Sequence, residues 1–321
     1  MTTGSHIAVV GAGPTGLSCA RRLAAHGCSV RVIEKSRGIG GRVAPRRRDG
    51  MQVDHGAPFL EGGSPAADRL IEAASAAGDA APWPEGGAAC WTGVPGMSSL
   101  FRSLSQGLEI TFSQEVKALH PERPGWRLET GEGDLTADHV VLALPAPQVI
   151  RLLERREPGL VEQLRSVGFR PTYTLIVSFE ADPGWPTLLR PSHGPFELLV
   201  GDATKPGRTV GHVWAAHADQ AWSEANLERE RPDAADALLT ALEEAMGRLP
   251  PVLLSLGHRW RYAQTSHPLG APFVESADGS TLLAGGDWAL GRTISDALTS
   301  GEAMADALIA RLSSAPTGLE A

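Results

Sequence analysis

The stretch Ile7-Ala-Val-Val-Gly-Ala-Gly-Pro-Thr-Gly-Leu17 decides the fold that this sequence predicts. Its small apolar residues 7–10 are typical of a buried parallel strand. Gly11, Gly13 and Gly16 follow with the spacing G-x-G-x-x-G. In such a unit the first glycine permits a tight turn, the second lets a pyrophosphate approach the backbone, and the third lets the next helix pack closely. The stretch therefore predicts a strand, a phosphate-binding turn and a helix whose N-terminus faces the phosphate.

The residues that follow complete this unit. Gly27 is placed to cap the C-terminus of the helix, and residues 30–33 predict a second strand. Glu34 ends that strand 18 residues after Gly16 (34 − 16), about where an acidic residue accepts hydrogen bonds from a ribose. A glycine-rich turn in an ordinary α/β domain is the alternative. The combination of strand, glycines, capped helix, strand and acid favours dinucleotide binding.

Composition and charge narrow the class of protein. The chain has 321 residues, with 29 basic and 37 acidic side chains and a formal net charge of −8, which argues against a nucleic-acid partner or an anionic membrane surface. No apolar run is long enough to span a bilayer, and the first strand begins too early for a signal peptide, so we expect a cytoplasmic protein. Cys19, Cys28 and Cys90 form neither a C-x-x-C pair nor a zinc spacing, and no metal site is expected.

A second glycine-rich loop, Lys35-Ser-Arg-Gly-Ile-Gly-Gly-Arg42, follows the acid. Arg42 is a natural partner for a pyrophosphate because a planar guanidinium binds phosphate oxygens in pairs. A plain NAD-binding unit does not need this loop, and the combination resembles the FAD-binding oxidoreductases of the amine-oxidase and glutathione-reductase type. A surface loop with solvated arginines is the alternative, and it fits part of the run at residues 46–48.

The resemblance becomes more specific at the next motif. Arg42-Val-Ala-Pro-Arg-Arg47, followed by Val53-Asp-His-Gly-Ala57, is similar to the renalase family, in which a G-R-x-x-x-R-R element precedes an Asp-His-Gly-Ala turn beside the flavin. The family usually continues Gln-Tyr-Phe-Thr, whereas this chain has Pro58-Phe-Leu-Glu61. His55 is open to two interpretations: it acts as a base, or it holds the turn through its ring nitrogens.

The resemblance to this family extends from residue 7 to about residue 312. Stretches that carry it on the substrate side are 91–97, 201–208, 212–217, 222–226 and 258–263. Two further sites depart from the family pattern. Asn226 stands where the family has His, and Gly201-Asp202 stand where Arg-Asn is expected.

The motif and the resemblance together predict non-covalent FAD. No cysteine occurs after Cys90, so the late-chain cysteine link of some amine oxidases is impossible, and this family does not use His55 as a link. The resemblance places the N-terminus of a helix that opens near Ser295 at the flavin pyrimidine, where its partial positive charge favours the reduced, anionic flavin. The residues predicted to contact the cofactor are Gly11, Ala12, Gly13, Thr15, Gly16, Glu34, Lys35, Gly41, Arg42, Asp54, His55, Gly56, Ala57, Val116, Gly286, Asp287 and Ile294.

The resemblance also implies residues on the substrate side. The catalytic candidates are His55, Trp260 and Tyr262, and the predicted substrate contacts are Pro58, Met97, Asp202, Trp214, Trp260 and Tyr262. Ordinary sheet-face packing is the alternative for the three aromatic residues, and core filling is the alternative for Met97.

These elements predict an α/β fold: a Rossmann-like FAD-binding domain with p-hydroxybenzoate-hydroxylase or amine-oxidase topology, interleaved with a β-rich α+β substrate domain. The predicted FAD domain is discontinuous and comprises residues 1–62, 94–150 and 276–321, and the substrate domain comprises 63–93 and 151–275. Helices are expected at 64–78, 98–108 and 234–249, a connection at 79–90, and antiparallel strands at 172–180 and 210–217.

Three functions are consistent with these motifs. The first is a renalase-like oxidase that accepts a hydride from a 2- or 6-dihydro isomer of NAD(P). It would pass the electrons to O₂, giving H₂O₂, because the chain has no second glycine triplet and no dithiol. The second is a flavin oxidase or desaturase of an amine or secondary metabolite. The third is a flavin- or nucleotide-binding protein without turnover.

Overall fold

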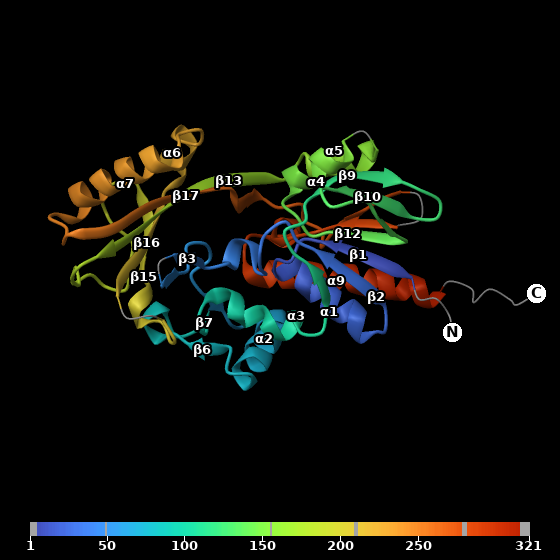
Figure 1. Ribbon diagram of the computed structural model, residues 1–321, viewed down its shortest axis with the longest axis horizontal. Helices are drawn as coiled ribbons and strands as arrows, with labels where there is room; N and C mark the ends of the chain where they lie inside the picture. Colours follow the sequence, from blue (N-terminus) through green and yellow to red (C-terminus); the bar gives the residue numbers. More distant parts are fainter. Residues whose placement is uncertain (1–4, 49, 155, 209–210, 278–280, 315–321) are drawn as a thin grey trace, which may run out of the picture. The chain divides into compact units, whose positions relative to one another are not determined.

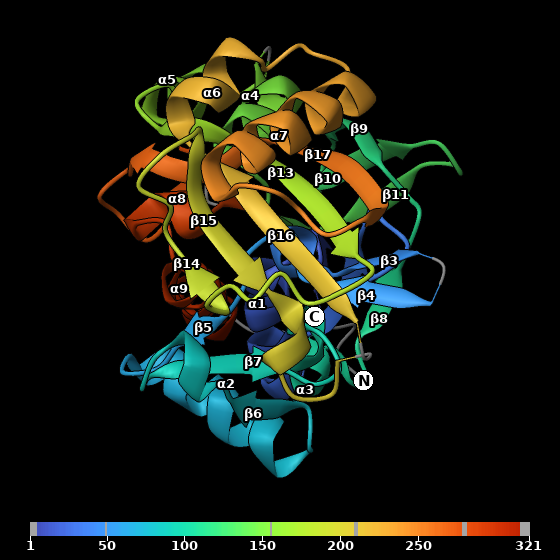
Figure 2. The same ribbon diagram turned by 90° about the vertical axis from the view of Figure 1, so that its left-hand side faces the viewer.

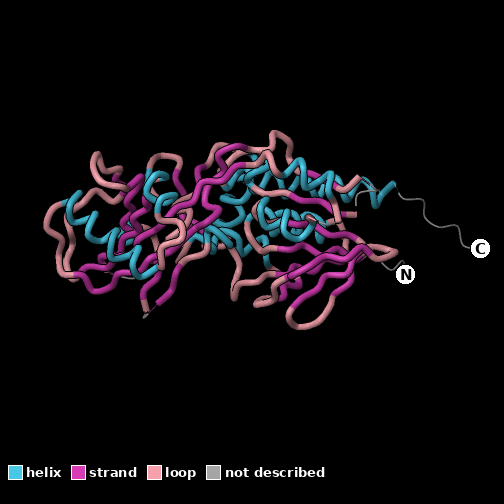
Figure 3. The backbone as a smooth tube through the Cα atoms, turned by 90° about the horizontal axis from the view of Figure 1, so that it is seen from above, coloured by secondary structure: helices cyan, strands magenta, loops and turns pink. Residues whose placement is uncertain are grey.

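The computed structural model describes residues 5–48, 50–154, 156–208, 211–277 and 281–314, and the chain divides into two compact units (Figure 1). The first unit comprises residues 1–41, 104–168 and 267–321, and the second comprises 42–103 and 169–266. Each unit is thus built from separate segments of the chain, and helices and strands occur in both (Figure 3).

The first unit is organised around a six-stranded sheet with the order β18-β19-β12-β1-β2-β8. The predicted first strand is β1 (His6–Val10), and it pairs in parallel with β2 (Ser29–Ile33) and β12 (His139–Leu142). Its apolar residues are buried, as a strand between two parallel neighbours requires. The edge strands are β8 (Glu109–Thr111) and β18 (Val274–Glu275), and β19 (Leu282–Ala284) lies between β18 and β12.

Two long helices of the first unit lie against each other. Helix α1 (Pro14–Ala25) begins within the glycine motif, and Gly27 at φ +87° lies just beyond its end, as predicted. Helix α9 (Ile294–Ser314) packs on α1, where the Ser18 hydroxyl donates to the Leu298 carbonyl at 3.2 Å. Gly301 brings the two backbones close, since a Cβ at this position would overlap the carbonyl oxygen of Thr15.

The remaining elements of the first unit are short. An antiparallel sheet is formed by β9 (Val116–Pro121), β10 (Trp126–Thr130) and β11 (Leu135–Ala137). The helices are α4 (Ala146–Leu153), α5 (Pro158–Leu164) and α8 (Asp287–Leu290).

The second unit contains a five-stranded sheet, β14-β15-β16-β13-β17 (Figure 2). Its strands are β13 (Gly168–Phe179), β14 (Leu188–Leu189), β15 (Phe196–Gly201), β16 (His212–Ala218) and β17 (Val252–His267). The predicted strand at 210–217 is therefore β16, although Val210 lies outside the described residues. The predicted antiparallel pairing of this strand with β13 is present.

The two faces of this sheet have different neighbours because successive side chains of a strand point to opposite sides. Leu175, Val177 and Ala216 form a core with Leu238 and Leu242 of helix α7 (Arg231–Met246), which crosses the strands in Figure 2. On the other face, Ile176, Val213 and Ala215 pack against Val53. Helix α7 ends before the predicted Leu249 because Gly247, at φ +82°, stops it.

Smaller elements complete the second unit, and two of them correct the sequence prediction. The region 79–90 is not a plain connection, because it contains β6 (Ala80–Pro82) and a 3₁₀ turn at Pro84–Gly86. The expected helix at 98–108 is a 3₁₀ segment, Met97–Phe101, followed by the short α3 (Arg102–Ser105), and Gly107 at φ +75° prevents its extension. The others are β3 (Arg46–Arg48), β4 (Met51–Val53), β5 (Leu60–Glu61), α2 (Pro65–Ala76), β7 (Cys90–Gly93) and α6 (Gln220–Ala225).

The described part of the chain has neither an apolar helix of bilayer length nor a cluster of metal-ligating side chains. No helix in it is long and apolar enough to cross a bilayer. Nor does it contain a group of three or more His, Cys, Asp or Glu side chains arranged to hold a metal ion.

Candidate dinucleotide and catalytic sites

The glycines of the motif differ in what surrounds them. Gly11 has φ +106°, and an added Cβ would lie 2.6 Å from the Ala143 carbonyl oxygen. A Cβ on Gly16 would overlap the carbonyl oxygen of Gly11. At Gly13, in contrast, nothing lies within 4 Å of the position that a Cβ would take. Two glycines thus serve packing, and the third leaves an open space at the tip of the turn.

The open space lies at the N-terminus of α1. Gly13 is the N-cap of this helix and has no side chain to satisfy its first amides. The loop 38–41 packs beside the turn, where the Gly40 amide donates to the Ala12 carbonyl at 2.9 Å. Free helical amides and the positive end of the helix dipole bind phosphate, so these residues fit the pyrophosphate of a dinucleotide.

Glu34 connects the end of β2 to the glycine turn. It is 6% exposed, and its Oε2 accepts from the Ala12 amide at 2.8 Å. Its Oε1 accepts from the Ser36 amide at 2.7 Å. Each carboxylate oxygen has a second acceptor position, so the side chain can also bind a ribose hydroxyl. The prediction of Glu34 as the ribose acceptor is consistent with this geometry.

We expect Glu34→Ala to weaken FAD binding by about 1–3 kcal/mol, because the ribose and the Ala12 amide would lose their acceptor. Isothermal titration of the apoprotein with FAD measures this change. Glu109→Gln is a suitable control, since Glu109 is exposed on the edge strand β8 and forms an ion pair with the exposed Arg31. Wild-type affinity in Glu34→Ala would show that the ribose binds elsewhere.

The other predicted cofactor residues of the first unit occupy the ends of its elements. Thr15 and Gly16 lie in the first turn of α1, Lys35 follows β2 and is exposed, and Val116 begins β9. Gly286 donates its amide to the Ser300 hydroxyl at 3.0 Å, and the buried Asp287 opens α8. Ile294 begins α9, whose first turn is capped reciprocally by Thr293 and Asp296.

In the second unit, the predicted turn at residues 54–57 is held at several points. The Asp54 amide donates to Oδ2 of Asp202 at 3.2 Å, and the Ala57 amide donates to the Arg42 carbonyl at 3.1 Å. The His55 carbonyl accepts from Nε1 of Trp260 at 3.0 Å. The Arg42 guanidinium donates to the Ala263 carbonyl at 3.0 Å, so part of its donor set is used by β17. The proposed contacts of these residues with the cofactor stay predictions.

The His55 ring lies in an aromatic cluster. Its centroid is 4.5 Å from that of His258 and 5.0 Å from that of Trp260. Burial, with His258 and Arg46 nearby, lowers the pKa of His55 to about 3, and burial lowers the pKa of His258 to about 4. Nδ1 of His55 is buried and has no hydrogen-bond partner among the described residues. This nitrogen therefore does not hold the turn, and the ring is uncharged near neutral pH.

The predicted substrate residues are only partly brought together. His258, Trp260 and Tyr262 alternate along β17 and share one face, where Tyr262 stacks edge-on with Phe169 at 5.7 Å. Trp214 does not join them. It packs on the α7 face with Trp185, and it covers Gly201, where a Cβ would lie 3.0 Å from its ring. Sheet-face packing is thus the interpretation that fits Trp214.

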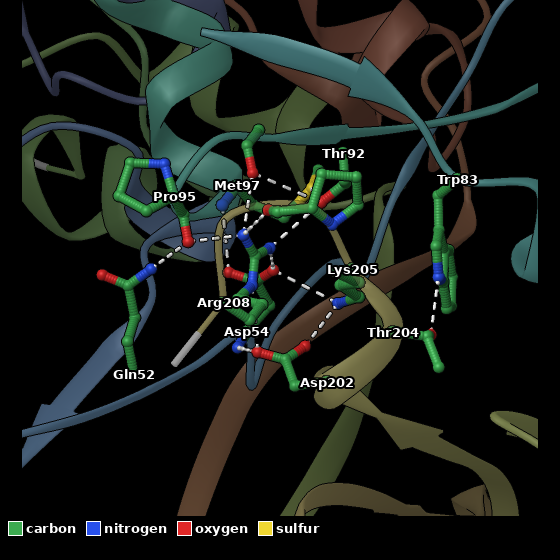
Figure 4. A network of polar contacts seen from close by, with 12 residues as sticks. Gln52, Asp54, Trp83, Thr92, Pro95, Met97, Asp202, Thr204, Lys205 and Arg208 are labelled. Carbon is green, nitrogen blue, oxygen red and sulfur yellow. Dashed lines mark hydrogen bonds and ion pairs between the residues drawn. The ribbon is translucent and has the colours of Figure 1, made fainter. Parts of the chain in front are cut away.

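The other predicted substrate residues lie in the second unit. Met97 is completely buried, and its sulfur accepts from the Thr92 hydroxyl at 3.6 Å, so core filling describes its observed contacts. Pro58 is partly exposed. Asp202 is buried in ion pairs with Lys205 and Arg208, and through them it joins Asp54 (Figure 4). Sequence reasoning missed these two basic residues, because only their burial distinguishes them from surface charges.

Comparison with known proteins identifies the family. The sequence profile of the flavin containing amine oxidoreductases matches residues 84–309, and a profile of NAD(P)-binding Rossmann-like domains matches residues 9–74. The chain therefore belongs to the flavin containing amine oxidoreductase family. The predicted fold class, the FAD cofactor and the class of FAD-dependent oxidoreductase are confirmed at the level of this family. The finer resemblance to renalases is not confirmed.

Solved structures of two amine oxidases have a similar fold. Cyclohexylamine oxidase from Brevibacterium oxydans IH-35A has a TM-score of 0.72 at 14% identity, over 97% of this chain and 100% of that chain. Putrescine oxidase bound to putrescine has a TM-score of 0.70 at 14% identity, over 96% and 99%. At this identity the likeness shows the fold.

Curated relatives match over shorter stretches. A 4,4'-diapophytoene desaturase from Staphylococcus haemolyticus is 52% identical over 50 residues, 16% of this chain and 10% of the desaturase. Coproporphyrinogen III oxidase from Propionibacterium freudenreichii is 43% identical over 67 residues, 21% of this chain and 13% of the oxidase. The chain thus spans only about a tenth of the length of these relatives.

We expect the FAD to be bound without a covalent link. A covalent link commonly uses Cys or His at the flavin ring. Cys19 and Cys90 are buried and Cys28 is partly buried, and burial raises the pKa of all three thiols. Acid precipitation should release the yellow colour into the supernatant. Colour retained in the pellet would contradict this prediction and direct attention to His55.

Proposed function

We propose that this chain is an FAD-dependent oxidase or desaturase that removes a hydride from a small amine or other organic metabolite. The family match over residues 84–309 carries the proposal, because it extends far beyond the dinucleotide-binding motif. We further propose that the first unit binds the FAD and that the second unit supplies the residues that select the substrate. When bound, FAD supplies the hydride acceptor.

The aromatic cluster of the second unit supports a role in substrate binding. Trp260 and Tyr262 lie on one side of β17, and aromatic rings are suited to binding an apolar or planar substrate. The His55 ring beside Trp260 is uncharged, since burial lowers its pKa to about 3. It is therefore a poor base for an alkylammonium ion at neutral pH. An amine substrate would have to bind in its neutral form.

The same observation favours a second candidate function. A dihydropyridine needs no deprotonation before it gives up a hydride, so a site with neutral imidazoles also suits a 2- or 6-dihydronicotinamide nucleotide. The sequence resemblance to the renalase family supports this substrate, whereas the comparisons support the amine and desaturase class. We propose O₂ as the electron acceptor in both cases, because the sequence has no second glycine triplet and no C-x-x-C dithiol.

Anaerobic flavin bleaching distinguishes these functions. The purified protein is mixed without air with a panel of small amines, with 2- and 6-dihydronicotinamide nucleotides and with ordinary 4-dihydro NADH. Fast bleaching by an amine, followed by H₂O₂ when air is admitted, is the result that we expect. Fast bleaching by the dihydronicotinamide isomers alone would favour the second function. A flavin that no donor reduces would instead favour a binding protein without turnover.

A further inference from the structure

A buried group of four charged side chains lies directly beside the His55 turn. We call Asp54, Asp202, Lys205 and Arg208 the ion quartet (Figure 4). Their side chains are 0–3% exposed. Lys205 Nζ lies 3.2 Å from Asp54 Oδ2 and 2.7 Å from Asp202 Oδ1. Arg208 pairs with the same two carboxylates. The quartet contains two acids and two bases, so its formal charge is balanced.

The remaining polar atoms of the quartet bind other segments of the second unit. Asp54 Oδ1 accepts from the Met97 amide at 3.0 Å. Arg208 donates to the Thr92 hydroxyl at 3.0 Å and to the Gly93 carbonyl at 2.9 Å. Lys205 Nζ also lies 5.3 Å from the centre of the Trp83 ring. The quartet thus joins the loops at 52–57, 92–97 and 202–208.

Stability alone is a weak explanation for this arrangement. Removing charges from water carries a large desolvation cost, and well-packed apolar residues often stabilise a core as well as a buried ion pair does. Unlike apolar contacts, the hydrogen-bonded ion pairs fix the orientation of the side chains, since a carboxylate oxygen accepts hydrogen bonds only within a limited range of angles. Asp54 is both a member of the quartet and the residue before His55.

Three anchors hold the turn that carries the His55 ring. The Asp54 carboxylate is held by the quartet, the His55 carbonyl by Trp260 and the Ala57 amide by the Arg42 carbonyl. Gly56 packs so closely that a Cβ would overlap the Arg42 carbonyl oxygen. Yet Nδ1 of His55, whose side chain belongs to a residue only 5% exposed, has no partner within the described ranges. A rigid turn thus presents one unpaired ring nitrogen.

We propose that Asp54 is a positioning residue, which acts through the ion quartet to fix the orientation of the His55 ring at the proposed substrate site. The role of His55 as a substrate contact rests on the proposed function, whereas the fixing of the ring does not. The charged and titratable groups around the ring are His258, Arg46 and His217.

Charge-balanced variants separate positioning from stability. Asp54→Asn leaves the quartet with one excess positive charge, and we expect the Tm to fall by about 6–15 °C. The double change Asp54→Asn with Lys205→Met restores neutrality and should recover most of that Tm. NMR of the protein with labelled histidines measures the pKa of His55, and the His55→Gln variant assigns its signal. In the double variant this pKa should nevertheless rise from about 3 toward its ordinary value. Bleaching by the donor found for the wild type should slow by about tenfold, which is the loss of about 1.4 kcal/mol.

Two further variants make the result decisive. Arg208→Lys keeps the charge and loses the planar fork, so it should fold and still raise the pKa of His55. Glu228→Gln breaks an exposed pair with Arg261 and should change neither the Tm nor the His55 pKa. An unchanged His55 pKa in every folded quartet variant would overturn the proposal and leave the quartet a structural feature. If no donor reduces the wild type, the proposed function fails, but the Tm and pKa measurements still decide whether Asp54 positions the ring.

Discussion

Gly13→Val will give a folded but colourless protein. The side chain at this position would enter the space at the N-terminus of α1, where nothing of the protein lies within 4 Å of a Cβ. The valine side chain would therefore block the phosphate without overlapping other residues of the protein. Loss of one or two charge-assisted hydrogen bonds, each worth about 1.5–3 kcal/mol, should weaken FAD binding by about 100-fold or more. Absorbance of the gel-filtered protein and titration with FAD measure the effect.

Gly16→Ala is the matched control for this experiment. A Cβ on Gly16 overlaps the Gly11 carbonyl oxygen, so even the smallest side chain should lower the Tm of the apoprotein. Gly13→Val should leave that Tm nearly unchanged. The Gly13 variant would thus affect mainly FAD binding, and the Gly16 variant would affect mainly the stability of the fold. If Gly13→Val retained stoichiometric FAD, the pyrophosphate would lie elsewhere on the protein.

The local structure of the candidate dinucleotide site was predictable because its determinants lie close together in the sequence. The strand 7–10, the three glycines and Glu34 lie within about 30 residues, and each has a steric or hydrogen-bonding role that a spacing motif encodes. The structure shows Gly11 and Gly16 in tight backbone packing and the Glu34 carboxylate on the Ala12 amide. Only the last contact was not expected, since the motif assigns the acid to ribose.

The second unit was less predictable because its contacts depend on register and burial. Trp214 and Trp260 both lie in strands with aromatic residues, and only the pairing of β16 with β13 shows that Trp214 faces α7. A shift of one residue would reverse that assignment. Lys205 and Arg208 look in the sequence like solvated charges of a loop. Their pairing with Asp54, about 150 residues earlier, appears only after folding.

The long-range packing of α1 on α9 is a second place where one glycine has a large effect. At Gly301 a Cβ would overlap the Thr15 carbonyl oxygen and lie 3.1 Å from the Cβ of Ser18. Both neighbours belong to the first turns of α1, immediately after the glycine turn. The helices cannot separate at this point without moving the amides that we propose as the phosphate site.

We therefore expect Gly301→Val to destabilise the protein by about 3 kcal/mol or more, because overpacking forces backbone shifts that a well-packed helix pair resists. FAD affinity should fall as well, since α1 would be displaced. Gly159→Val in α5 is the control: Gly159 is exposed, and nothing lies within 4 Å of its added Cβ, so the change should stay within about 0.5 kcal/mol. Denaturant unfolding of the two apoproteins measures stability, and titration with FAD measures binding. Equal stability of the two valine variants would mean that α9 does not pack on α1 as closely as Gly301 indicates.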